Sequence, residues 1–256
     1  MVLWKQRFFV TCALFSWVSL IYSAFVATII PVVGLALILY FLRMAWPTDW
    51  QKRAGLEFNG KTLLLALAAT GVFLGIFRFY YAQVAARSEV TIDLVAILPH
   101  VLPGMIFTLV QTCAEEIILG SLLLRFVQDR CLSLSETWAT VIVAVVFGLM
   151  HVVFYQSGLI LPRESLHPMS LVGLILAGIL RNLLIVRFGH IAYAWALHFS
   201  WNLYMFHSPM LRSGVALGEA AKFNLLFGTW EFICLAGLAI AAVCLGCALV
   251  KTRKAI

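Results

Sequence analysis

The feature that most constrains the fold is a set of long apolar runs, the longest being Phe8–Leu42, which contains no charged residue. As a helix at about 1.5 Å per residue, this run would be roughly 50 Å long. That length is too great for a single crossing of a hydrocarbon core about 30 Å thick. The run is therefore expected to form two tightly joined spans, with a break or bend at Pro31 and Gly34.

The composition places the chain in a bilayer. It is 63% hydrophobic and 11% charged, with a mean hydropathy of +1.02, whereas soluble domains are about 45–50% apolar and about 25% charged. The runs are continuously apolar and do not alternate in polarity as barrel strands do, so they are interpreted as helices. The sequence predicts an all-α, polytopic transmembrane helical bundle of about eight spans.

Six further spans are expected after the first run, separated by short polar connections. They are Thr62–Ala85, Pro103–Val127, Thr137–Tyr155, Met169–Val186, His190–Phe206 and Phe223–Val250. No linker or internal repeat divides the chain, so residues 1–256 are predicted to form a single integral membrane domain.

The formal charge of +7 is explained by membrane topology, because the basic residues are scattered singly between apolar runs, a pattern that does not favour a nucleic-acid partner. Eight spans place both termini on one side, and the basic residues are concentrated there. That side is assigned Lys5, Arg7, Arg43, Lys52, Arg53, Lys61, Arg125, Arg130, Arg181, Arg187, Lys251, Arg253 and Lys254; the other side is assigned Arg87, Arg163, Arg212 and Lys222. Both termini are therefore predicted to be cytoplasmic, with the protein in the plasma or inner membrane.

Two adjacent carboxylates, Glu115 and Glu116, interrupt the span Pro103–Val127. A charged group at bilayer depth costs about 2.5–3.5 kcal/mol on insertion scales, so such residues usually have a function. Neighbouring helical positions differ by about 100°. One carboxylate can therefore face a cavity while the other supports it.

Other polar side chains occur in later spans. His151 lies four residues after Phe147, and Asn202 lies four residues after His198, so each pair shares one helix face. A desolvated glutamate can take a proton from water with the help of one imidazole. A second imidazole and an amide can donate hydrogen bonds to a developing oxyanion. This set suits amide hydrolysis without a covalent intermediate or a metal, although spacing alone does not choose that chemistry.

The order of these motifs resembles the CPBP family, the CAAX-prenyl proteases and bacteriocin-processing (Abi) enzymes, which are intramembrane glutamic proteases. The matching segments are Glu115–Glu116, Phe147–His151 and His198–Asn202, for the family patterns EExxxR, FxxxH and HxxxN or HxxxB. The resemblance covers residues 103–206.

The resemblance implies a role for each motif residue. Glu115 and His151 would activate the attacking water, His198 and Asn202 would bind the oxyanion, and Glu116 would support the site. The sequence departs from the pattern at Gly120, where the family motif has arginine. Arg125 lies about 140° around a helix from position 120 and is no obvious substitute.

The predicted function is an intramembrane endopeptidase that cleaves the C-terminal or leader segment of a membrane-associated protein or peptide entering from the bilayer. No cofactor is expected. A zinc protease is the enzyme alternative, since zinc accepts Glu and His ligands, but the chain has no His-Glu-x-x-His motif. The alternative outside enzymes is a non-catalytic binding, immunity or carrier protein with the same fold, which Gly120 favours.

Two further polar residues are expected to be structural. Glu231 is predicted to be a satisfied interfacial group near one end of the last span, and His190 is predicted to be solvated at a helix start.

Overall fold

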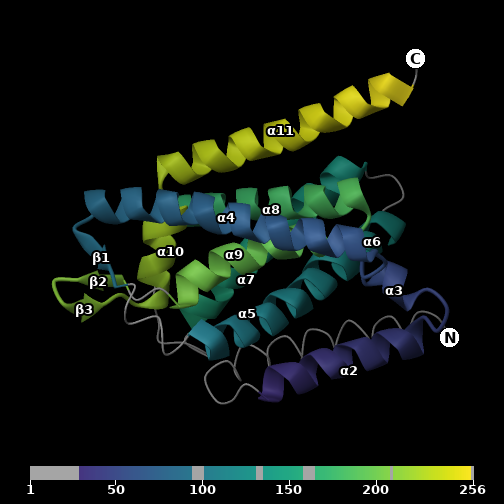
Figure 1. The fold of residues 1–256 in the computed structure, drawn as a ribbon, viewed down its shortest axis with the longest axis horizontal. Coiled ribbons are helices and arrows are strands. Elements are labelled where there is room, and N and C mark those ends of the chain that lie inside the picture. Colours follow the sequence, from purple (N-terminus) through teal and green to yellow (C-terminus); the bar gives the residue numbers. More distant parts are fainter. Residues whose placement is uncertain (1–28, 94–100, 131–134, 158–164, 208–209, 255–256) are drawn as a thin grey trace.

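The apolar runs fold into long helices that lie side by side (Figure 1). The computed structural model describes residues 29–93, 101–130, 135–157, 165–207 and 210–254. Their helices are α2 (Ile29–Ala45), α3 (Trp50–Arg53), α4 (Gly60–Arg87), α5 (Val101–Glu115), the π-helix η2 (Glu116–Leu122), α6 (Leu123–Arg130), α7 (Glu136–Ser157), α8 (Pro168–Phe188), α9 (Ala192–His207), α10 (Glu219–Phe227) and α11 (Trp230–Lys254).

Four helical segments within the described ranges are long and apolar enough to cross a membrane, and a bent helix pair adds a fifth if it counts as one span. The four are Gly60–Arg87, Gly104–Gln128, Glu136–Val153 and Pro168–Phe188. The prediction of an all-α integral membrane protein is confirmed at this level. Residues 8–28 of the first predicted pair of spans lie outside the described residues.

Two predicted features of the spans differ in the structure. Helix α2 continues through Pro31 and Gly34, so a break at these residues is excluded. The last predicted span, Phe223–Val250, is not one helix, because α10 and α11 meet at an angle of 63°. Gly228, at the end of α10, was the available signal for that break.

The bend between α10 and α11 is held by the end of α4. The Tyr80 hydroxyl lies 2.6 Å from both the Leu226 carbonyl oxygen and the Thr229 hydroxyl. Thr229 Oγ1 in turn accepts a hydrogen bond from the Phe232 amide in the first turn of α11. Glu231 forms an ion pair with Arg87, so the predicted carboxylate has a partner.

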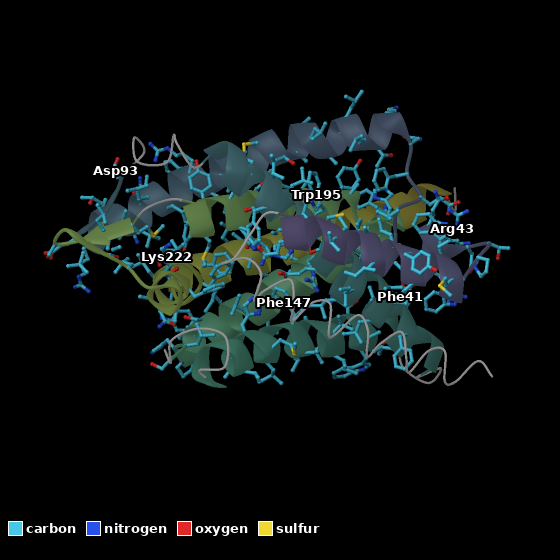
Figure 2. All side chains as sticks on the ribbon, turned by 90° about the horizontal axis from the view of Figure 1, so that it is seen from below. Phe41, Arg43, Asp93, Phe147, Trp195 and Lys222 are labelled. Carbon is cyan, nitrogen blue, oxygen red and sulfur yellow. The ribbon has the colours of Figure 1, made fainter. Side chains whose placement is uncertain are left out.

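A small sheet lies at one end of the bundle, outside the helices (Figure 1). Strand β2 (Met210–Arg212) pairs antiparallel with both β1 (Val90–Ile92) and β3 (Val215–Ala216). The opposite end carries the short helix α3. Figure 2 labels residues towards both ends: Arg43 lies towards one, Asp93 and Lys222 towards the other, and Phe147 between them.

Helix α8 is the centre of the bundle, where it packs against α7, α9, α10, α11 and η2. Small residues permit the close approach. A Cβ at Gly178 would lie 3.1 Å from the Ala144 Cα of α7, and one at Gly173 would collide with the Phe227 carbonyl oxygen of α10. This close helix contact is typical of membrane bundles, in which packing replaces the hydrophobic effect between helices.

We expect Gly173→Ala to destabilise the protein by about 1–3 kcal/mol, because the added methyl group meets backbone that cannot move aside easily. The midpoint of thermal unfolding in detergent should fall by about 2–4 °C for each kcal/mol. Gly71→Ala is the matched control, since its Cβ would meet nothing within 4 Å. An equal decrease for both variants would contradict the close packing of α8 against α10.

Candidate active site

The two glutamates lie where the α-helix α5 changes into the π-helical segment η2. Glu115 is the last residue of α5 and Glu116 is the first of η2, and both side chains are buried. Such π-helical segments are rare and are frequently found at functional sites. No periodicity in the sequence predicted this one.

Glu116 is fully buried and contacts two helices. Its Oε1 lies 2.8 Å from His198 Nδ1 on α9 and 3.5 Å from Arg181 Nη1 on α8. A carboxylate oxygen accepts, so the imidazole nitrogen Nδ1 is the donor. The carboxylate of Glu116 therefore orients the His198 ring and joins η2 to both neighbouring helices.

Glu115 faces the other nitrogen of the same imidazole. Its Oε2 lies 3.6 Å from His198 Nε2, and its Oε1 accepts a hydrogen bond of 3.1 Å from Gln111 Nε2, one turn earlier on α5. Asn202 Nδ2 is also close to His198 Nε2, at 3.2 Å. The structure thus brings four of the five predicted site residues, Glu115, Glu116, His198 and Asn202, into one buried cluster.

His151, the fifth predicted residue, joins this cluster through an aromatic ring. The rings of His151 and Phe147 are 4.6 Å apart, and Phe147 lies 6.2 Å from His198. His151 Nδ1 donates a 2.8 Å hydrogen bond to the Phe147 carbonyl, which can only accept, so Nε2 carries the free lone pair when the ring is neutral. Within the described residues no hydrogen bond joins His151 to Glu115.

Sequence reasoning missed three polar residues near the cluster, namely Gln111, Arg181 and Asn182. Arg181 was grouped with the basic residues of the cytoplasmic side, but it lies within α8 with no exposed surface and is not a residue of a connection. Its position well inside the predicted span Met169–Val186 was the available signal. Gln111 and Asn182 are neutral, so the rule that a charge at bilayer depth has a function did not apply to them.

The comparisons with known proteins support the motif interpretation. Residues 97–204 match the family model described as type II CAAX prenyl endopeptidase Rce1-like. The chain carries a domain of this protease family. The predicted resemblance to the CPBP proteases is thereby confirmed, as is the prediction that the protein belongs with proteases. No curated protein and no solved structure matches the chain.

The Rce1-like domain contains Gly120 where the family motif has arginine, and the structure shows what occupies that space. A Cβ at position 120 would lie 2.6 Å from Ile185 Cδ1 on α8 and 2.8 Å from Glu116 Oε2. The missing side chain therefore allows the Glu116 carboxylate to lie over position 120. Ser121 donates a 2.8 Å hydrogen bond to the Arg53 carbonyl and so joins η2 to the end of α3.

No group of three or more His, Cys, Asp and Glu side chains suited to a metal ion is found in the part of the chain that the structure describes.

His190, outside the site of the Rce1-like domain, is not simply solvated as predicted. It packs among Phe58, Phe188 and Tyr193, and partial burial lowers its pKa below the usual value.

We expect the effects of substituting Glu116 and Arg181 on the free energy of unfolding to be strongly non-additive. Glu116→Gln and Arg181→Leu should each cost about 3–5 kcal/mol, because each leaves one buried charge without its partner. The double variant should regain most of that loss, since Gln keeps an acceptor for His198. The free energies of unfolding of wild type, both single variants and the double variant are measured in mixed micelles. If the loss in the double variant equals the sum of the two single losses, the coupling is contradicted.

Proposed function

We propose that the protein is an intramembrane endopeptidase in which Glu115 and His151 activate a water molecule against a peptide bond. The observation that carries this proposal is the approach of Glu115 to His198, Glu116 and Asn202, from helices distant in sequence, inside an apolar bundle. Burying two carboxylates and an imidazole together is costly in a membrane, so a functional reason is expected.

In the proposed reaction, water loses a proton to the Glu115 carboxylate and attacks the carbonyl carbon. His151 assists through Nε2, which its hydrogen bond to the Phe147 carbonyl leaves available. The C–O bond forms, the tetrahedral intermediate collapses, and the C–N bond breaks as the proton passes to the leaving amine. No covalent enzyme intermediate and no metal takes part.

His198 and Asn202 are proposed to bind the oxyanion. His198 donates through Nδ1 to Glu116, and this bond turns its Nε2 towards the Asn202 amide and the Glu115 carboxylate. Nε2 is proposed to interact with the reacting oxygen from this position. The amide of Asn202 lies beside that nitrogen and supplies a second donor. Donors held in place before the reaction stabilise the transition state more than the substrate.

The proposed substrate is the C-terminal or leader segment of a membrane-associated protein or peptide that enters from the bilayer. The Rce1-like family model supports a peptide substrate. Glu115, Glu116 and His151 lie on helical segments that are long and apolar enough to span the membrane, which supports approach through the lipid phase.

We also propose eight spans with both termini cytoplasmic, with the bent pair α10 and α11 counted as one span. Arg43 lies towards one end of the bundle while Asp93 and Lys222 lie towards the other (Figure 2). The end of α11, which carries Lys251 and Lys254, lies at the same end as α3 (Figure 1). Removing Arg181 from the cytoplasmic group leaves the excess of basic residues on that side clear.

The alternative of a non-catalytic binding, immunity or carrier protein was favoured by Gly120 alone. The space over that glycine is filled by the Glu116 carboxylate, and an arginine from another helix approaches the same carboxylate. Glu115 and His198 also face each other and not different sides of the bundle. These contacts support the enzyme over the binding protein.

Glu115→Gln is expected to lower cleavage by about 10²–10⁴-fold, the usual contribution of a positioned general base. In host cells lacking the protein, membrane-protein termini that depend on it are identified by mass spectrometry after complementation with each variant. Wild type should restore these termini and Glu115→Gln should not. The control is Glu231→Gln, which alters an exposed carboxylate paired with Arg87 and should restore them. The proposal is contradicted if Glu115→Gln restores these termini fully, or if no terminus depends on the protein.

A metal chelator separates the proposed mechanism from zinc chemistry. Cleavage of a dependent polypeptide by the purified protein in vesicles should be unchanged after prolonged treatment with a membrane-permeable chelator, because the proposed bases are carboxylate and imidazole. Inhibition that added zinc reverses would instead establish the zinc alternative.

A further inference from the structure

The Glu116 carboxylate lies in the space that a side chain at position 120 would occupy. A Cβ there would be 2.8 Å from Glu116 Oε2, and the same atom would press on Ile185 of α8. The glycine thus removes the side chain that the motif would place on η2 and lets α8 approach. Ile185 lies four residues after Arg181, so the same face of α8 carries both residues towards η2.

Arg181 brings a buried guanidinium to that carboxylate. Arg181 and Glu116 are both fully buried, with Nη1 at 3.5 Å from Oε1. The guanidinium carbon lies 4.3 Å from the ring centre of Phe147 on α7. Nη2 also donates to Asn182 Oδ1 at 3.4 Å, and the Asn182 amide donates to the Thr140 carbonyl on α7 at 3.0 Å.

Phe147 on α7 and Asn182 on α8 hold the guanidinium in place while it faces Glu116 on η2. The planar cation over an aromatic face is a stabilising arrangement, and it limits rotation of the long side chain. Arg181 has no exposed surface, so it is not available to bind substrate. Its contact with the site is through Glu116.

We propose that Arg181 is the positioning residue for Glu116 and, through Glu116, for His198, replacing from α8 the arginine that is absent at position 120. This inference rests on the proposed function. One carboxylate oxygen, Oε1, serves both the guanidinium and the imidazole. Without the guanidinium, the carboxylate can turn away, and the ring of His198 loses the acceptor that orients its oxyanion donor.

This arrangement predicts a specific kinetic effect. Arg181 acts on an interaction used in the transition state and not on substrate binding, so its loss lowers kcat and leaves KM nearly unchanged. Arg181→Met should lower kcat about 100-fold, comparable to the loss of an oxyanion donor. Arg181→Lys keeps the positive charge but not the planar contact with Phe147, and should lower kcat only about 10-fold.

Gly120→Ala tests the same geometry without touching Arg181. The methyl group displaces the Glu116 carboxylate, so kcat should fall about 10-fold or more. The matched control is Gly148→Ala, which also adds a methyl group against α8. Its Cβ would lie 2.8 Å from Ile175 Cγ1, and its other near neighbour is Leu171, so it does not meet Glu116. Gly148→Ala should keep the kcat of wild type. All variants are assayed in vesicles at a temperature where thermal unfolding shows each to be folded.

A spectroscopic measurement makes the test independent of turnover. In protein labelled with ¹⁵N-histidine, the His198 Nδ1 proton held by Glu116 gives a resonance that is assigned by its loss in His198→Gln. That resonance should persist in Gly148→Ala and Arg181→Lys, and broaden or disappear in Arg181→Met and Gly120→Ala.

The outcomes separate the two proposals. If Glu115→Gln is inactive but Arg181→Met and Gly120→Ala keep wild-type kcat and the Nδ1 resonance, Arg181 has no positioning role. The positioning role is equally contradicted if Arg181→Lys is as impaired as Arg181→Met, or if only KM rises. If Glu115→Gln cleaves like wild type, the proposed function itself fails and the inference falls with it.

Discussion

The ion pair of Glu116 and Arg181 is the interaction on which the rest of the site depends. Both side chains are fully buried, and neither would be stable alone at bilayer depth, where an uncompensated charge is costly. The pair links η2 to α8, and Glu116 extends the link to α9 through His198. One charge interaction therefore sets the positions of three helices around the cluster.

The close packing of α8 makes this pair possible. Gly173 lets α8 lie against the backbone of α10, Gly178 lets it lie against α7, and Gly120 opens the facing side of η2. A larger side chain at any of these positions meets another atom at less than a normal contact distance. Small residues thus serve the chemistry indirectly, because they bring the guanidinium on α8 within reach of the carboxylate on η2.

The sequence predicted the parts that depend on local composition. The apolar runs predicted α4, α7 and α8, and the resemblance of the motifs to the CPBP family implied that Glu115, Glu116, His198 and Asn202 belong to one site. The bend before Trp230 was missed because it depends on hydrogen bonds from Tyr80, a residue far away in the sequence. Arg181 was missed because it was grouped with the basic residues of the connections, although it lies within the predicted span Met169–Val186. Its partners, Glu116 and Phe147, come from distant parts of the sequence.

Phe147 connects His151 to the rest of the cluster. Within the described residues no hydrogen bond joins His151 to Glu115. Its ring contacts His151 and lies beneath the Arg181 guanidinium, with the His198 ring at nearly a right angle beyond. Its carbonyl accepts from His151 Nδ1 and so fixes which nitrogen of that ring is free. This packing has a consequence for the chemistry, because one residue orients the proposed water-activating histidine through its carbonyl and ring, and its ring also restrains the arginine that holds Glu116. A shift of this ring would therefore disturb both proton transfer and oxyanion binding.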